Sequence, residues 1–482
     1  MALAGLVLVL LVGVILRALL MAAWRPAFVG YSDSGAYLYM AMQDLWGATL
    51  HPVGYALLLS DLHAITRALW LMIGLQHLFG LLSAILLWLT VRQAGASRWL
   101  ALLPAAIVAL NGAEIFLEHS ILSESLFILL LSCSLYCAAR ATGSVNPRWA
   151  ALAGLLLALD NTVRVVAQPL IIVLLAWLLL GSGGSWRLRA RATGYAMACV
   201  LVVLGGYAVI QHQQTGYWGL STPAGGWNLY GRVAPFADCT KFTPPAGTRV
   251  LCEKTPPAKR TQTVEEYLYS PPVSPGLKAF SRFGGPESAT QASDRRIESF
   301  ARTAIEHQPL DYARTILEGM LAYVTPVRIE FANREELGAS YDLFYHHTLF
   351  DAGNSEYVLK NRLPWYGVHA YHHDQALLSF LLGYETHTRV TGWLMALLML
   401  LTLLAPFSPR GRPRQIGTLL FLVAWASLLS PVATHWWDSR YTIPSLGPLG
   451  AAAAIGLWQA ARFTRRITRP RRTATRLTSP VT

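Results

Sequence analysis

The sequence LAGLVLVLLVGVILRALLMAAW fills residues 3–24, and YSDSG follows it at residues 31–35. The first stretch is long enough to cross a bilayer as one helix, which takes about 20 apolar residues. A carboxylate directly after such a helix is costly to keep unless it stays hydrated, binds a ligand or does chemistry. The two stretches together predict a membrane protein and make Asp33 the leading functional candidate.

The composition agrees with lipid as the main solvent of the chain. Of its 482 residues, 54% are hydrophobic and only 13% are charged, and the mean hydropathy is +0.39. The first apolar run has no small-residue cleavage site in a suitable place, so we expect it to be retained. The net charge of +13 comes from arginines spread over short loops, which argues against a nucleic-acid partner.

We expect an all-α polytopic membrane protein with about ten membrane helices. They are placed at residues 3–23, 68–91, 98–112, 121–140, 148–162, 165–181, 193–211, 387–406, 415–431 and 441–461. The 148–181 region fits either two spans or one helix broken between Asp160 and Arg164. With this count, the arginine-rich loops and tail share one side, which the positive-inside rule makes the cytoplasm.

This orientation predicts a bacterial cytoplasmic membrane protein with both termini inside the cell and the Asp33 loop outside. The expected parts are an N-terminal membrane module, an outer segment rich in loops and helices, C-terminal membrane helices and a basic tail on the lipid headgroups. They cover 1–211, with the first outer loop at 24–67, then 212–386, 387–461 and 462–482. Within the outer segment, Pro309 should split an amphipathic region at 292–323 into two helices.

The five cysteines fall into two groups. Cys133, Cys137 and Cys199 lie in predicted membrane helices and are best explained as packing residues. Cys239 and Cys252 flank a Pro-rich loop on the oxidising side of the membrane, which predicts a disulfide. A metal-binding pair is the weaker alternative, since neither CxxC spacing nor a nearby histidine accompanies them.

Two outer loops carry candidate chemistry. Asp33 precedes an apolar stretch at 36–45 that could lie on the membrane surface, so a helix N-cap is the alternative role for this carboxylate. His51 precedes Pro52, which also fits a simple turn. In the second loop, a helix dipole explains one or two acidic residues but not the whole cluster of Glu114, Glu118, His119, Ser123 and Glu124.

Two arginines complete the set of candidates. Arg164 stands at an outer helix end and Arg440 just before the last membrane helix. Arginine holds phosphate by bidentate contacts, so a lipid-linked phosphate is the expected ligand. Snorkelling, or a salt bridge of Arg440 with Asp438, is the alternative for these side chains.

Four motifs resemble the polyprenyl-phosphate-dependent glycosyltransferases of the GT-C membrane fold, in particular bacterial relatives of the dolichyl-phosphate-mannose protein mannosyltransferase group. They are Ser32-Asp33-Ser34 with Tyr37, His51-Pro52-Val53-Gly54-Tyr55, the stretch from Glu118 to Ser125, and Arg440-Tyr441-Thr442-Ile443-Pro444. The segments Gly226–Arg232 and Gln308–Arg314 look similar to outer segments of actinobacterial members.

The resemblance implies that Asp33 is the catalytic base. The family often has two adjacent acidic residues here, whereas serines flank Asp33, so a second carboxylate must come from Glu118 or Glu124. Metal dependence therefore stays open, with Mg²⁺ or Mn²⁺ held by Asp33 and Glu118, and with His51 and His119 as further candidate ligands.

The expected reaction is inverting transfer of a hexose or pentose from a polyprenyl-phosphate donor to an envelope glycan, lipid or protein on the outer face of the membrane. One base suffices because the donor already has a good leaving group, and burial beside lipid is expected to raise the pKa of Asp33. Arg164 and Arg440 would hold the phosphate, while Glu118, His119, Glu124, His51 and Tyr37 would shape the acceptor side. A membrane transporter with Asp160 as its buried charge, or a non-catalytic envelope assembly protein, is the alternative.

Overall fold

The computed structural model describes residues 2–47, 50–143, 145–221, 224–280, 290–324, 352–435 and 437–468. Within these ranges the chain is helical apart from turns and one two-stranded antiparallel sheet, in which β1 (Trp24–Arg25) pairs with β2 (His372–His373). The predicted all-α membrane fold is confirmed. Residues 469–482 of the predicted basic tail lie outside the described residues.

Helices of the N-terminal half form most of the bundle. Their bounds are α1 (Ala2–Ala23), α2 (Ser32–Met42), α3 (Gly54–Ile65), α4 (Leu69–Gln93), α5 (Leu102–Leu110), α6 (Gly112–Glu118), α7 (Glu124–Ala141), α8 (Pro147–Val163), η1 (Val165–Ala167), α9 (Gln168–Leu180) and α10 (Trp186–Thr215).

The remaining helices divide between an outer segment and the bundle. The outer segment holds α11 (Gly225–Val233), α12 (Val264–Tyr269), α13 (Pro275–Phe280), α14 (Gln291–His307) and α15 (Pro309–Ala322). The chain then continues with α17 (Ala352–Asn361), α18 (Gln375–Thr388), α19 (Gly392–Thr402), η7 (Ala405–Phe407), α20 (Arg412–Thr434) and α21 (Ser439–Thr468).

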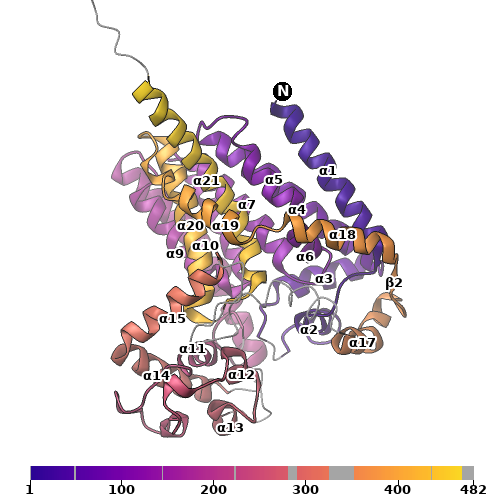
Figure 1. Cartoon of the computed structure of the whole chain (residues 1–482), viewed down its shortest axis with the longest axis vertical. Helices are drawn as coiled ribbons and strands as arrows, with labels where there is room; N and C mark the ends of the chain where they lie inside the picture. Colours follow the sequence, from indigo (N-terminus) through magenta and orange to yellow (C-terminus); the bar gives the residue numbers. More distant parts are fainter. Residues whose placement is uncertain are drawn as a thin grey trace, which may run out of the picture.

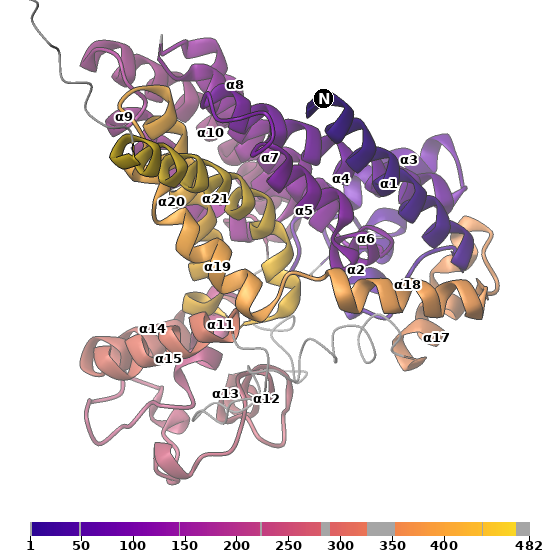
Figure 2. The same cartoon turned by 45° about the horizontal axis from the view of Figure 1, so that its top comes forward.

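The two ends of the bundle differ in what they carry. The start of α1 and the end of α21 lie at one end of the bundle, and α11 to α15 lie at the other (Figure 1). Figure 2 shows α17 and α18 beside α1 and α2, away from α14. The chain that returns from the outer segment therefore covers the loop after the first helix.

Fewer helices than expected are long enough to cross a membrane by themselves. Among the described residues, α1, α4, α7, α10 and α20 meet this criterion, and a sixth span results if α18 and the helices after it are joined across a 45° bend. The predicted count of ten spans is not confirmed. The expected span at 98–112 is divided into α5 and α6, because the Asn111 side chain accepts from the backbone N–H of Ala113 and caps α6.

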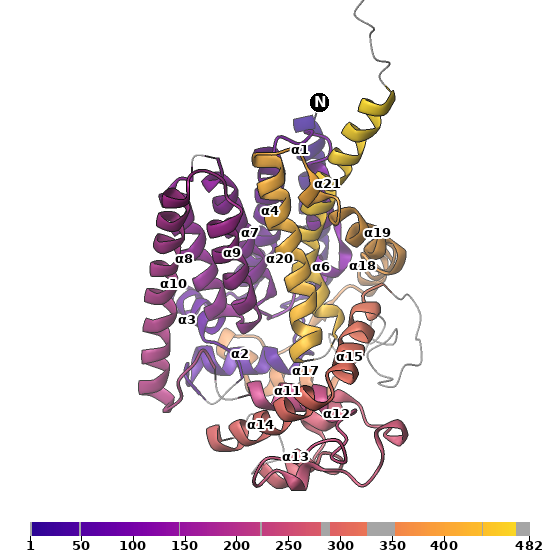
Figure 3. The same ribbon diagram turned by 90° about the vertical axis from the view of Figure 1, so that its left-hand side faces the viewer.

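Helices α8 and α9 occupy the 148–181 region, where two spans or one broken helix were expected, and neither is long enough to count as a span by itself. The N–H of Gly143, before α8, donates to the carbonyl of Ser182, after α9. Figure 3 shows the two helices side by side. They are therefore two antiparallel helices that reverse at Arg164, and Asp160 lies in the last turn of α8.

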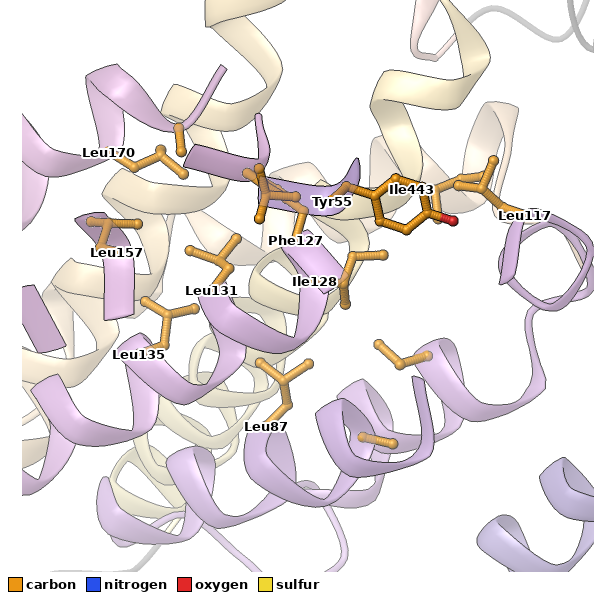
Figure 4. Packing of buried hydrophobic residues seen from close by; sticks show 14 of the residues in the cluster. Tyr55, Leu87, Leu117, Phe127, Ile128, Leu131, Leu135, Leu157, Leu170 and Ile443 are labelled. Carbon is orange, nitrogen blue, oxygen red and sulfur yellow. The ribbon is translucent and has the colours of Figure 1, made fainter. Parts of the chain in front are cut away.

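One large apolar core joins the bundle helices. Figure 4 shows Leu131 and Leu135 of α7 near Leu157 of α8, with Leu87 of α4 nearby, and these four side chains are nearly or fully buried. On α7 the two leucines are one turn apart, so they share a face of the helix. The packed bundle holds the loops at either end in fixed relative positions.

The outer segment has its own smaller core, in which Trp227 and Tyr230 of α11 pack near Phe300 of α14. The predicted split at Pro309 is confirmed, because α14 ends at His307 and α15 begins at Pro309. The predicted disulfide between Cys239 and Cys252 is also confirmed.

Removing this disulfide is expected to destabilise the outer segment by about 3 kcal/mol, because the bridge restricts a short loop in the unfolded chain. The double substitution Cys239→Ser/Cys252→Ser should therefore increase proteolysis of the outer segment at moderate denaturant concentrations. The measurement is the denaturant midpoint of cleavage, with Cys199→Ser, at a free cysteine, as control. An unchanged midpoint in the double variant would contradict the expectation.

Candidate active site

The candidate site lies at the end of the bundle that carries α11 to α15, where four separate segments meet. Asp33 belongs to the first turn of α2, Glu124 begins α7, Arg164 follows α8 and Arg440 is the second residue of α21. Helix ends supply all four residues, so the packed bundle sets their positions.

Asp33 makes two contacts across the fold. Its Oδ2 accepts a hydrogen bond of 2.7 Å from Nη1 of Arg440, and its Oδ1 lies 3.5 Å from Nε2 of His51. The N-cap of α2 is Tyr31, and no side chain caps this helix. The helix-cap alternative for Asp33 is therefore wrong.

Arg440 also contacts a second carboxylate. Its Nε lies 3.2 Å from Oε1 of Glu124, and Arg164 pairs with the same oxygen. Nη1 of Arg164 donates to the Ser123 hydroxyl at 3.1 Å, and that hydroxyl is 2.9 Å from the Tyr37 hydroxyl. Two arginines and two carboxylates thus form one connected group.

The two carboxylates differ in access. The side chain of Glu124 is 1% exposed, whereas that of Asp33 is 18% exposed and that of its neighbour His51 is 23% exposed. A molecule that enters the site can therefore touch Asp33, while Glu124 lies behind the two guanidinium groups. Of the two, Asp33 is the one placed to exchange a proton with a substrate.

The pKa of Asp33 is shifted in the opposite direction to the one expected. Burial raises the pKa of Asp33, but Arg440 and His51 outweigh burial and hold it well below its ordinary value. The prediction of a raised pKa is wrong, because the sequence did not reveal that Arg440 pairs with this carboxylate. Asp33 is ionised at neutral pH and ready to accept a proton.

The residues of the site do not fit a divalent metal. Asp33 and Glu124 already share Arg440, so a metal bound there would face two guanidinium groups at close range. Within the described ranges, no group of three or more His, Cys, Asp or Glu side chains is arranged to hold a metal ion. Glu118, the other candidate ligand, pairs with a different arginine.

A small apolar pocket of about 20 Å³ adjoins Arg164. It lies among α7, η1, α9, α20 and α21. Its lining residues are Phe127, Arg164, Val166, Leu170, Ser427, Pro431, Tyr441 and Pro444. The cavity therefore joins an apolar wall to one cationic group.

Glu118 and His119 do not contact Asp33 but form a second buried group. Glu118 accepts two hydrogen bonds of 2.7 Å from Arg17 of α1, and its Oε2 is 2.8 Å from Nδ1 of His77. His119 bridges His77 and the Trp24 carbonyl. The prediction that these two residues shape the acceptor side is not supported by this geometry.

The hydrogen-bond acceptors of this second group determine which histidine nitrogens carry protons. The Trp24 carbonyl only accepts, so Nε2 of His119 donates, and Nδ1 of a neutral His119 accepts from His77. Burial and His77 lower the pKa of His119, in agreement with a neutral ring. One further proton must lie between His77 and Glu118, so the group is tightly constrained.

Breaking the Arg17–Glu118 pair is expected to cost about 3–5 kcal/mol, because removal of one partner leaves a buried charge. Arg17→Met should therefore lower the unfolding midpoint strongly, and Arg17→Met/Glu118→Leu should recover part of the loss. The control is Arg302→Met, at an exposed pair with Glu298 worth about 0.5 kcal/mol or less. Equal midpoints for Arg17→Met and Arg302→Met would contradict the expectation.

Sequence reasoning missed Arg17, His77 and Asn354. Arg17 is a charge inside the first apolar run, and such a charge usually has a partner within the protein. His77 lies similarly within α4. The Asn354 amide donates to the backbone before Asp33, and no local pattern in the sequence signals this contact.

Three solved structures show a distant similarity to the chain. The oligosaccharyltransferase of Archaeoglobus fulgidus in the apo form has 11% identity and a TM-score of 0.46, over 97% of this chain and 51% of that one. AglB of the same organism, in complex with an inhibitory peptide and a dolichol-phosphate, has 12% identity and a TM-score of 0.45, over 97% and 51%. This chain spans about half the length of those two proteins.

The third structure, ArnT from Cupriavidus metallidurans bound to undecaprenyl phosphate, has 12% identity and a TM-score of 0.37, over 95% of this chain and 78% of that one. No curated protein matches the chain in sequence. Residues 61–212 match the model of the dolichyl-phosphate-mannose-protein mannosyltransferase family, which confirms for this part of the chain the resemblance stated from its motifs.

Proposed function

We propose that this protein is an inverting glycosyltransferase that moves a sugar from a polyprenyl-phosphate donor to an acceptor hydroxyl. The observation that carries the proposal is Arg440, which contacts the accessible carboxylate of Asp33 and, with Arg164, the buried carboxylate of Glu124. A base and two phosphate-binding cations thus lie within one group of contacts. The family match of residues 61–212 supports the same activity.

The donor would place its phosphate on the two arginines. Arg164 lines the small apolar pocket among α7, α9, α20 and α21, so the lipid chain would approach from this apolar side while its phosphate contacts Arg164 and Arg440. The phosphodiester carries one negative charge, and the departing lipid phosphate gains a second. Cations fixed at this point therefore stabilise the transition state more than the bound donor.

Asp33 would act as the base. The acceptor oxygen attacks the anomeric carbon, the bond from that carbon to the phosphate oxygen breaks, and the electron pair leaves with the lipid phosphate. The acceptor proton moves to Asp33. A bound phosphate competes for Arg440 and weakens its hold on Asp33, so the proton affinity of the carboxylate rises as the donor binds.

The same proposal places the site on the outer face of a bacterial cytoplasmic membrane. The positive-inside rule assigns the arginine-rich loops, the start of α1 and the end of α21 to the cytoplasm. The site and the outer segment lie at the opposite end of the bundle (Figure 1). Envelope glycans, lipids and proteins are therefore the proposed acceptors, and hexose and pentose the proposed sugars.

The test uses the purified full-length protein in nanodiscs. Polyprenyl-phosphate hexoses and pentoses are offered with an envelope extract as acceptor, and nucleotide sugars serve as control donors. Release of polyprenyl phosphate and an inverted anomeric signal in the product are expected from at least one lipid donor. Transfer from nucleotide sugars alone, or release from none of the lipid donors, would refute the proposal.

A further inference from the structure

We propose that Asn354 is a positioning residue for Asp33, a role that rests on the proposed function. Its side-chain amide donates to three consecutive carbonyls, those of Val29, Gly30 and Tyr31, at 2.9, 2.9 and 2.8 Å. Asn354 lies in α17, more than 320 positions further along the chain. Helix α2, which carries Asp33, begins directly after the three carbonyls.

The carbonyls of Val29 and Gly30 need a donor because their residues are buried, whereas the Tyr31 carbonyl also accepts from the Ser34 N–H at 3.1 Å. A buried carbonyl without a partner destabilises the structure, and residues 29 and 30 belong to no helix or strand that would supply one. An amide has only two N–H groups, so the three acceptors share them. The Asn354 side chain therefore fixes the backbone conformation directly before α2.

Helix α17 is itself held in place on several sides. Val358 is fully buried, and a Cβ placed on Gly35 would lie 3.2 Å from it, so α17 and α2 approach closely. The hydroxyl of Tyr371 donates to the Ser355 carbonyl. Beyond Tyr371, strand β2 pairs with β1 at the end of α1.

A shift of Asp33 would weaken its contact with Arg440 and misplace the base. Misplacement of a reacting group by about 1 Å can lower the rate by about 10²-fold. The arginines stand on other elements, at the start of α21 and after α8, and Arg440 keeps its contact with Glu124 when Asp33 shifts, so donor binding depends on Asn354 much less than the position of the base does. The structure therefore assigns Asn354 an effect on kcat rather than on KM for the donor.

The experiment compares Asn354→Ala with Asn361→Ala in the full-length protein in nanodiscs. Asn361 is a matched control on the same helix, since its amide donates to Tyr357, one turn back, and is exposed. In Asn354→Ala, hydrogen exchange of the amides at residues 31–36 should rise about tenfold. The kcat should fall about 10- to 100-fold with KM for the donor nearly unchanged. Asn361→Ala should change neither quantity.

The two readouts separate the outcomes. Unchanged exchange at residues 31–36 in Asn354→Ala would overturn the proposal, whatever the activity. Faster exchange with unchanged kcat would also overturn it, because the contact would then be structural only. A wild-type protein that transfers no sugar while Asn354→Ala exchanges faster would refute the proposed function and support the anchoring of the loop. A large rise in KM in the Asn354→Ala protein would overturn the positioning role.

Discussion

Asp33→Asn is expected to lower sugar transfer by about 10²- to 10⁴-fold, the range that one positioned base contributes. Asparagine has nearly the same shape and can still accept a hydrogen bond from Arg440, but its amide cannot take a proton from the acceptor hydroxyl. The variant should therefore bind the donor almost as well as the wild type. Steady-state kcat and KM with the lipid donor measure the two effects separately.

The loss should not come from misfolding. In Asp33→Asn, Arg440 still lies beside Glu124, so the substitution strands no guanidinium group. Asp44→Asn is the matched control, because Asp44 is an exposed aspartate in the same loop. The unfolding midpoint of each variant is measured alongside the kinetics. Full transfer by a folded Asp33→Asn protein would show that another group is the base.

Asp438 is the rival that this experiment must exclude. Burial raises the pKa of Asp438, and its Oδ1 accepts the backbone N–H of Arg440 at 2.8 Å. A carboxylate with a raised pKa is a stronger base than Asp33, although Asp438 has a backbone contact to maintain. If Asp438→Asn lost sugar transfer while Asp33→Asn kept it, Asp438 and not Asp33 would be the base.

Local patterns predicted those parts of the fold that local physics determines. The apolar run at 3–24 became α1 because a bilayer-length helix satisfies its own backbone. Pro309 separated α14 from α15, since proline cannot continue the hydrogen bonds of the helix before it. Cys239 and Cys252 paired across a short loop. Each of these features depends on residues close together in sequence.

Side-chain partners across the fold could not be predicted in this way. Glu118 and Glu124 were grouped because only five residues separate them, yet α6 ends at the first and α7 begins at the second. The turn between these helices sends Glu118 to Arg17, 101 positions away, and Glu124 to Arg164 and Arg440. Closeness in sequence therefore did not predict closeness of these two side chains, because the chain changes direction between them.

The direction of the pKa shift of Asp33 also depends on a partner that is distant in sequence. Its position beside an apolar helix correctly indicated burial, and burial alone raises the pKa. The opposing cation, Arg440, comes from the start of α21 at the far end of the chain. The sign of the shift was therefore determined by a contact between residues 407 positions apart.

Arg440→Gln is expected to lower kcat/KM for the lipid donor by about 10²- to 10³-fold, as does loss of one donor that stabilises a developing negative charge. The departing phosphate would keep Arg164 but lose its second cation. Because Arg440 contacts the phosphate before and during the reaction, KM should rise and kcat should fall. Initial rates at several donor concentrations resolve the two parts.

Arg440→Gln should also change the pH dependence of the transfer rate. In the wild type, the Asp33 carboxylate is ionised above its lowered pKa, and the ion pair with Arg440 stabilises the fold until the pH falls through that value. In Arg440→Gln, burial still raises the pKa of Asp33, and the guanidinium that opposed this effect is gone. The acidic limb of the rate profile should therefore move to higher pH.

Two controls make the Arg440 result specific. Arg440→Lys keeps a positive charge but cannot reach both carboxylates with one planar group, so its rate should fall between those of wild type and Arg440→Gln. Arg314→Gln removes an exposed arginine of the outer segment and should leave the rate and its pH profile unchanged. If Arg440→Gln lost activity without any shift of the acidic limb, Arg440 would bind phosphate but Asp33 would not be the titrating base. If KM for the donor also stayed constant, the assignment of Arg440 to the phosphate would be wrong.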